Sequence, residues 1–245
     1  MSDPQASSFS DEQFDKLYPP GVERHYWSRC RNRVIARELR RSGAQGPILE
    51  VGCGKGIVVR YLRDDGFDIT GIELAPVAPL TDMVAHVRTG IDVMDLEPAI
   101  ADRVRTVLLL DVIEHLEDPK GFLEAIRRKM PALTHVLVTV PARQELFSNF
   151  DRFNGHYRRY DPDMVRAHVD PQRTLDFRAS YVFHGLYPAA RILLARKGER
   201  EVGFNVPQGF LANTVHALLG LFFYIEYLIL PSRWKGTSVI AVAKP

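Results

Sequence analysis

Short apolar runs alternate with longer amphipathic stretches along most of the chain. The runs that are typical of strands are residues 48–51, 68–72, 86–88, 106–110, 135–140, 175–183 and 237–243. Apolar positions at helical spacing separate several of these runs, at residues 57–64, 119–130 and 162–169. This alternation predicts an α/β fold, a doubly wound, seven-stranded and mostly parallel sheet with helices on both faces.

An amphipathic helix is predicted before the first strand, over residues 20–41. Its apolar positions include Val22, Tyr26 and Leu39, and several arginines stand on the opposite side. Two roles fit this pattern. The helix either covers a ligand bound at the sheet or packs on the sheet edge, which is the usual place of an apolar helix face.

A second helical segment makes an unusually long connection, of about fifty residues, between the last two predicted strands. Its apolar run, residues 215–230, covers roughly sixteen positions, whereas a bilayer span needs about twenty. Basic residues flank the run and Trp234 follows it, so residues 212–235 suit a helix lying at an anionic membrane surface. The alternative is burial against the domain or in a dimer interface, the commoner fate of apolar helices.

The most informative turn follows the first predicted strand and reads Gly52-Cys53-Gly54-Lys55-Gly56. Glycines at alternate positions let the backbone bend sharply and a ligand approach it, and the following helix offers unpaired N–H groups. The second strand ends on Glu73, where nucleotide-binding folds place an acid that accepts hydrogen bonds from ribose hydroxyls. A dinucleotide fingerprint would need a glycine at Ile57, and no P-loop Lys-Ser/Thr follows, which disfavours dehydrogenases and nucleoside triphosphatases.

Two later segments complete a known pattern. They are Gly90-Ile91-Asp92 after the third strand and Asp111-Val112-Ile113-Glu114-His115-Leu116-Glu117-Asp118-Pro119 at the fourth. Together with the glycine turn and Glu73, they resemble the class I S-adenosylmethionine-dependent methyltransferases over roughly residues 48–170. The chain most resembles the small-molecule O-methyltransferase branch, including enzymes of quinone biosynthesis, and bacterial relatives with a Gly-His-Tyr-Arg-Arg-Tyr segment.

The resemblance implies a Rossmann-like methyltransferase fold, S-adenosylmethionine as cofactor, and a set of contacts to it. The implied cofactor-binding residues are Gly52, Cys53, Gly54 and Gly56 at the methionine end, Glu50 beside the turn, Glu73 at the ribose, Asp92 at the adenine, and Asp111. Simpler roles stay open for two of them, because Glu50 could only cap local backbone and Asp92 could only stabilise a turn.

A cluster of acidic and imidazole side chains is predicted at the same edge of the sheet. Asp111, Glu114 and His115 stand at the end of the fourth strand, and His156 lies on the loop after the fifth. Such donors suit Mg²⁺, Mn²⁺ or Zn²⁺, and an ion would lower the pKa of an acceptor hydroxyl. By resemblance, some quinone-pathway and small-RNA 3′-end methyltransferases use Glu-x-x-Glu-His with a later His as a metal site, although aspartate replaces the first glutamate here. The alternative is catalysis without a metal, with His156 or His115 as general base.

The segment Tyr157-Arg158-Arg159-Tyr160 supplies candidate acceptor-binding residues. It joins two guanidinium groups with two aromatic rings, which can hold a phosphate, a carboxylate or a stacked ring. Otherwise the two arginines form surface ion pairs and the tyrosines pack against the next helix.

No linker rich in Pro, Gly or Ser divides the chain, so residues 1–245 are expected to form a single methyltransferase domain. Its expected parts are an N-terminal helical cap (1–45), a cofactor-binding core (46–183), a partly apolar helical insertion (184–236) and the last strand (237–245).

Composition narrows the class of protein. A net charge of +2 does not indicate nucleic-acid binding. The two cysteines, Cys30 and Cys53, form no disulfide framework, and residues 1–15 lack the basic-then-apolar order of a signal peptide. Both observations favour a cytoplasmic protein. Peripheral contact with the inner membrane surface stays open.

The leading hypothesis is methyl transfer to an oxygen of a small or amphiphilic acceptor, either quinone-like, lipid-linked or a glycan precursor. The rivals are a metal-dependent RNA 3′-end methyltransferase and a non-catalytic S-adenosylmethionine-binding partner protein. The oligomeric state stays open, with a dimer as one alternative.

Overall fold

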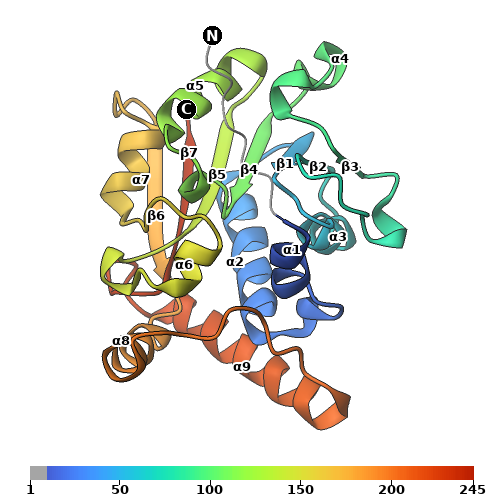
Figure 1. Ribbon diagram of the computed structural model, residues 1–245. Coiled ribbons are helices and arrows are strands. Elements are labelled where there is room, and N and C mark those ends of the chain that lie inside the picture. The colour runs from blue at the N-terminus through green and yellow to red at the C-terminus, as the bar shows by residue number, and fades with distance from the viewer. Residues whose placement is uncertain (1–9) are drawn as a thin grey trace.

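The computed structural model describes residues 10–245, and its centre is a seven-stranded sheet with the order β3-β2-β1-β4-β5-β7-β6 (Figure 1). The strands are β1 (Ile48–Val51), β2 (Ile69–Glu73), β3 (Val87–Thr89), β4 (Thr106–Leu110), β5 (His135–Pro141), β6 (Asp176–Val182) and β7 (Ser238–Lys244). β7 runs antiparallel to β5 and β6, and the other neighbours are parallel. The predicted mostly parallel, doubly wound sheet is confirmed.

Helices cover both faces of the sheet (Figure 1). They are α1 (Asp11–Leu17), α2 (Tyr26–Ser42), α3 (Ile57–Asp64), α4 (Pro98–Ala101), α5 (Pro119–Lys129), α6 (Asn149–Phe153), α7 (Pro162–Val169), α8 (Leu186–Lys197) and α9 (Gly209–Ile229). Single 3₁₀ turns lie in the connections, at Val22–Arg24, Thr81–Met83, Val93–Asp95, Ile113–His115 and Gln144–Leu146.

The core has two layers because successive side chains of a strand point to opposite faces. Leu108 of β4 and Leu137 of β5 belong to the layer under α2 and α3, whereas Leu109 and Val138 belong to the layer under α5 and α7. Each of these four side chains is buried, as expected for central strands covered on both faces. Because both faces of the sheet are covered, a ligand site is expected at the loops that follow the carboxyl ends of the parallel strands.

The predicted helix at residues 20–41 is divided in the structure. A 3₁₀ turn at Val22–Arg24 comes first, and α2 begins after His25, whose Nδ1 accepts the Trp27 N–H at 3.3 Å as a helix cap. α2 ends at Gly43, where φ is 72°. α1 was not expected, although Ser10 and Gln13 form a capping box at its start.

The helical insertion before the last strand is present as α8 and α9, but its apolar helix is longer than predicted. α9 has 21 residues and is long and apolar enough to cross a membrane by length and composition. Only 17% of its most apolar window is buried. Burial against the domain, the commoner alternative, is therefore wrong for most of this helix: α9 packs on α2 along one side and exposes the rest.

Candidate functional site

The glycine turn between β1 and α3 has the backbone that its sequence predicts. Gly52, Gly54 and Gly56 have φ values of 75°, 55° and 85°, a region that favours glycine. A Cβ atom on Gly54 would lie only 2.8 Å from the Tyr18 ring, so a side chain is excluded there for a second reason. α3 begins directly after Gly56, and its first N–H groups can therefore serve a ligand.

Glu73 lies at the end of β2, next to this turn. Its carboxylate accepts hydrogen bonds from the N–H groups of Gly54 at 2.8 Å and of Ala75 at 3.0 Å. The side chain is thereby oriented beside the turn, where the resemblance places the ribose. Its contact with a ribose stays a prediction.

Two other predicted cofactor contacts differ in their surroundings. Glu50 is buried, its Oε2 has no hydrogen-bond partner among the described residues, and burial raises its pKa to about 8. This oxygen is thus available to a donor that a ligand would bring. Asp92 instead caps the turn Val93–Asp95 by accepting the Met94 N–H at 2.9 Å, which is the simpler of its two predicted roles.

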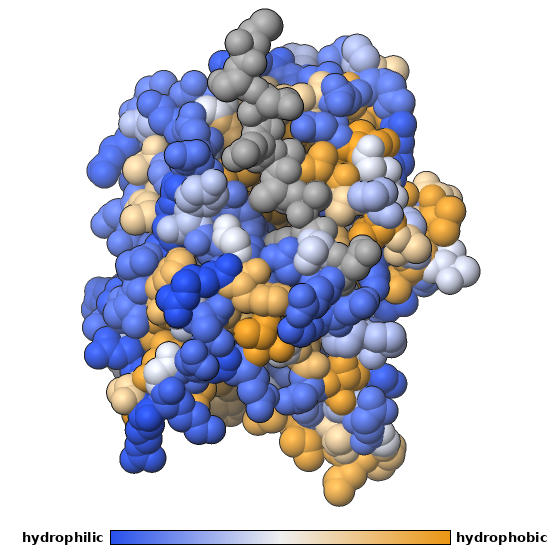
Figure 2. Space-filling view, viewed as in Figure 1, coloured by the Kyte–Doolittle hydropathy of each residue, from blue (hydrophilic) through white to orange (hydrophobic). Residues whose placement is uncertain are grey.

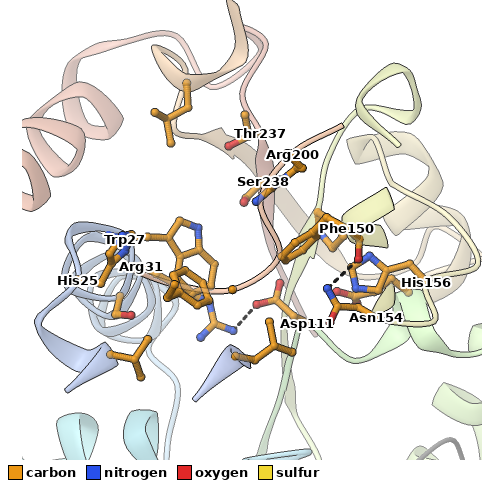
Figure 3. Close-up of a pocket in the computed structure, with 18 of the residues that line it drawn as sticks. His25, Trp27, Arg31, Asp111, Phe150, Asn154, His156, Arg200, Thr237 and Ser238 are labelled. Carbon is orange, nitrogen blue, oxygen red and sulfur yellow. Dashed lines mark hydrogen bonds and ion pairs between the residues drawn. The ribbon is translucent and has the colours of Figure 1, made fainter. Parts of the chain in front are cut away.

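A cavity of about 980 Å³ lies at the carboxyl ends of β1 and β4 (Figure 3). Arg31 reaches Asp111 from α2 on one side of it, and Asn154 and His156 face it from the loop after β5. α8 forms a further wall through apolar side chains such as Leu193. The candidate residues in its lining are Glu50, Gly52, Cys53, Asp111, Glu114, His115, His156 and Arg159. The cavity thus joins the glycine turn to the predicted catalytic cluster.

Three of the four predicted metal-ligating residues come together in this cavity. Ligand atoms of Glu114, His115 and His156 lie within 4.8 Å of one another, and the two imidazole rings meet edge to face at 4.6 Å. Glu114 is fully buried, and neither carboxylate oxygen has a hydrogen-bond partner among the described residues. Burial and the negative charge of Asp111 raise the pKa of Glu114 well above its usual range, and burial and His156 lower that of His115 to about 3.

Asp111 does not join that group, which corrects its prediction as a metal ligand. Its Oδ2 accepts a hydrogen bond from Arg31 Nη2 at 2.7 Å, and its Oδ1 accepts one from the Thr139 hydroxyl at 3.3 Å. The ion pair with Arg31 already compensates its charge. The backbone φ of Asp111 is 60°, rare for a residue with a Cβ, and such strain is commonly held at functional sites.

A buried aspartate that the sequence analysis did not single out orients His156. Asp151 is fully buried, and its Oδ1 accepts hydrogen bonds from His156 Nδ1 at 2.9 Å and Arg159 Nε at 2.8 Å. Its Oδ2 accepts the Ser148 N–H at 2.9 Å, which closes a capping box at the start of α6. With Nδ1 occupied, the Nε2 atom of His156 is the one left to act on a ligand.

Replacing Asp151 with alanine should lower the free energy of unfolding by about 3–5 kcal/mol, because it leaves the Arg159 charge buried without its partner. Urea denaturation followed by circular dichroism measures the loss. Asp163→Ala, which removes an exposed acid of α7, is the matched control and should change the free energy of unfolding by less than about 0.5 kcal/mol. Equal midpoints for the two variants would contradict the role given to Asp151.

The same carboxylate predicts a pH dependence. Burial acts to raise the pKa of Asp151, but the hydrogen bonds from His156 and Arg159 and the Arg159 charge outweigh it and lower the pKa to about 2. Its stabilisation is therefore complete above the unfolded-state pKa of about 4 and is lost as the pH falls through about 2. Asp151→Asn should lack this part of the acid-induced loss of stability.

The segment from Tyr157 to Tyr160 mostly does not face the cavity, which corrects its prediction as the acceptor-binding segment. Tyr157 is half exposed, and Arg158 donates to the Glu117 carbonyl at 3.0 Å. Tyr160 is buried and donates to the Ile113 carbonyl at 3.0 Å. Only Arg159 lines the cavity, and Asp151 already pairs with it.

Several lining residues were missed because they come from segments far away in the sequence. Tyr18 covers the glycine turn, and Arg31 stacks over the Trp27 ring at 4.9 Å while it pairs with Asp111. The amphipathic pattern of α2 predicted that its arginines lie opposite the core. It did not predict that Arg31 would reach Asp111 at the end of β4. One side of α2 lies in the core, and its amino-terminal part lines the cavity. That α2 covers a bound ligand stays a prediction.

Residues 23–174 match a family described as a methyltransferase domain. Among curated proteins, a ubiquinone biosynthesis O-methyltransferase of Xanthomonas euvesicatoria pv. vesicatoria (strain 85-10) is 26% identical over 138 residues, 49% of this chain and 57% of the relative. One of Xylella fastidiosa (strain 9a5c) is 27% identical over 108 residues, 41% and 43% of the two proteins. The chain spans about half the length of the curated relatives it matches.

Solved structures share the fold at low sequence identity. A SAM-dependent methyltransferase from Archaeoglobus fulgidus superimposes with a TM-score of 0.50 at 15% identity, covering 87% of this chain and 94% of the other. The methyltransferase domain of bacterial CtHen1-C superimposes with a TM-score of 0.52 at 13% identity. The match covers 89% of this chain and 97% of the other. Haemonchus contortus phosphoethanolamine N-methyltransferase 2 in complex with S-adenosyl-L-methionine superimposes with a TM-score of 0.52 at 16% identity. The match covers 99% of this chain and 61% of the other.

The matched region contains β1 to β5, the glycine turn and the Glu114–His115–His156 cluster, and it covers more than half of the chain. The chain therefore belongs to the methyltransferase-domain family and has the fold of the class I S-adenosylmethionine-dependent methyltransferases.

Proposed function

We propose that this protein transfers the methyl group of S-adenosylmethionine to an oxygen atom of a small or amphiphilic acceptor. The observation that carries the proposal is that one cavity joins the glycine turn to the Glu114–His115–His156 cluster. Methyl transfer from a sulfonium is an in-line displacement with an already activated donor, so the protein must align, desolvate and deprotonate the acceptor. The glycine turn is suited to hold the methyl donor, and the Glu114–His115–His156 cluster is suited to deprotonate the acceptor.

The residues at the acceptor end support removal of a proton. His156 has its Nδ1 bonded to Asp151, which fixes the ring and leaves Nε2 as the proton acceptor. Burial keeps His115 neutral at physiological pH, so it adds no repelling charge when a proton arrives at its neighbour. A hydroxyl acceptor placed within hydrogen-bond distance of His156 Nε2 would lose its proton to that atom as the methyl group arrives.

The cluster also fits a divalent cation. Glu114 offers two carboxylate oxygens without partners among the described residues, and His115 and His156 offer imidazole nitrogens. A bound cation would lower the pKa of an acceptor hydroxyl. Because the pKa of Glu114 is raised without a cation, binding would displace its proton, and cation affinity should increase with pH.

The curated relatives support an oxygen acceptor, since their names describe O-methyltransferases of ubiquinone biosynthesis. A quinone-like, lipid-linked or glycan-precursor acceptor is therefore the first class to assay. A second candidate function, metal-dependent methylation of an RNA 3′ end, is favoured only by the Glu114–His115–His156 cluster. The net charge of +2 weighs against it, because RNA binding usually needs a basic surface.

Calorimetric titration with S-adenosylmethionine and S-adenosylhomocysteine tests the proposal. Both ligands should bind the folded protein, and titrations after chelation and with Mg²⁺, Mn²⁺ or Zn²⁺ added back test the cation separately. Heat from a cation that disappears in Glu114→Ala, while cofactor binding stays, would support the metal-assisted form. Absence of binding by either cofactor ligand would overturn the proposed function.

A further inference from the structure

The outer side of α9 is an apolar surface with nothing of the described chain packed on it. We call it the α9 face and define it by its most exposed stripe, which consists of Leu211, Val215, Leu218, Phe222, Ile225 and Ile229. These positions recur every three or four residues and so lie on one side of the helix. Their exposed fractions run from 45% to 76%. Figure 2 shows hydrophobic side chains gathered at the lower edge of the molecule, where Figure 1 places α9.

The opposite side of α9 is held firmly, so the α9 face has a fixed orientation. Gly220 lets the helices approach closely, because a Cβ atom there would lie 3.0 Å from Arg29 Cβ of α2. The buried Glu226 carboxylate accepts the N–H groups of His184 at 2.6 Å and Gly185 at 2.8 Å. Tyr227 also donates to Glu38 of α2 at 2.9 Å. The exposure of the α9 face is therefore a property of the folded domain.

Positive charge lies beside the α9 face, toward the carboxyl end of α9. Exposed basic side chains stand on α8 and on the turn after α9: Arg191, Arg196, Lys197, Arg233 and Lys235. Trp234, which is 53% exposed, lies between the last two. Glu226 is buried, so the exposed acids of the segment are confined to the connection between α8 and α9. An apolar helix face with basic residues and tryptophan near one end matches an anionic membrane surface.

We propose that the α9 face docks on an anionic lipid bilayer, with α9 lying in the surface of the bilayer and not crossing it. Both ends of the insertion return to the same sheet, because β6 and β7, on either side of it, pair with each other. A helix fixed along α2 at the edge of this sheet cannot place its two ends on opposite sides of a membrane without leaving the domain.

A second copy of the chain fits the α9 face less well than a bilayer does. A pair of helices from two copies would bury one seam along α9. The apolar surface is wider than a helix-pair seam, because Leu221 and Leu228 beside the stripe are exposed at 43% each. A broad apolar surface with basic residues beside it suits an anionic bilayer better.

Docking in this orientation has a consequence for the acceptor, which rests on the proposed function. α8 lines the cavity with Leu193 and Leu194, and Leu193 is also 38% exposed beside Ile192 at 55%. The apolar wall of the cavity is thus continuous with surface that would meet the bilayer. An acceptor with a lipid tail could reach the site from the membrane with its tail along α8.

Flotation of the intact chain with vesicles tests docking. Vesicles of phosphatidylcholine with phosphatidylglycerol should carry the protein upward at low salt, and vesicles of phosphatidylcholine alone should carry much less. The variant L218S/F222S/I225S should bind at least about tenfold less, because three large apolar side chains leave the interface. V84S/I100S/M164S, which changes three exposed apolar residues elsewhere, is the matched control and should float like the unaltered protein. R233E/K235E should weaken binding roughly fivefold or more for each residue.

Each contrary outcome overturns docking. Unaltered protein that stays at the bottom of the gradient at low salt contradicts it, and so does equal flotation of L218S/F222S/I225S. A dimer seen by light scattering without vesicle binding, and dissociated by the same three substitutions, would assign the α9 face to a second copy. S-adenosylmethionine affinity of the same variants reports separately on the proposed function, because none of the substituted residues lines the cavity.

Discussion

Replacing Glu73 with alanine should weaken the binding of S-adenosylmethionine by about a hundredfold or more while the chain stays folded. Two effects combine. A carboxylate that accepts hydrogen bonds from ribose hydroxyls contributes about 1.5–3 kcal/mol for each bond, and 1.4 kcal/mol is a tenfold change in affinity. The same carboxylate also orients the glycine turn through the Gly54 N–H. Isothermal calorimetry measures the affinity, and circular dichroism checks the fold.

Two further variants sharpen this test. Glu97→Ala removes an exposed acid that pairs with Arg88, and it should leave the affinity unchanged. Glu73→Gln keeps one oxygen as acceptor for a backbone N–H and should lose less affinity than alanine does. If Glu73→Ala binds the cofactor like the unaltered protein, the ribose assignment is wrong.

Replacing His156 with alanine should reduce kcat by at least about a hundredfold, the scale of a positioned general base, while S-adenosylmethionine affinity stays the same. The reason is geometric: the imidazole lines the cavity, and Asp151 fixes its tautomer. The readout is S-adenosylhomocysteine formed with the best acceptor from a panel of phenols, quinols and lipid-linked sugars.

The control for this variant is His86→Ala, since His86 lies before β3 and outside the cavity lining. It should keep full activity. Asp151→Asn should shift the pH profile of kcat, because it changes the charge beside the imidazole, and a merely structural role would not do so. Full activity in His156→Ala would remove the loop after β5 from the mechanism.

The sheet and the glycine turn were predictable because their determinants are local. Buried strands read as short apolar runs, and a turn that needs positive φ at three positions shows its glycines in the sequence. Glu114, His115 and His156 were predictable as a cluster for a related reason: the carboxyl ends of neighbouring parallel strands meet at one edge.

The other parts of the site depend on contacts between distant segments. Arg31 and Asp111 are far apart in the chain, and their ion pair decides that Asp111 does not join the cluster. Asp151 was hidden in a short helix, and the signal that could have found it was the Ser148-x-x-Asp151 capping box. The sequence left two alternatives open for α9, because apolarity predicts that a helix face needs cover and does not specify whether the cover is protein or lipid.

Tyr18, placed over the glycine turn by α1, has a practical consequence for handling this protein. The ring is packed against Gly54 and is supported by Phe14 of α1, at a centroid distance of 5.6 Å. The residue that covers the turn thus follows α1 and lies outside residues 23–174, which the family model matches. A fragment of residues 23–174 would keep the region that the family model matches and would lack Tyr18. Assays on such a fragment would therefore report on an incomplete pocket.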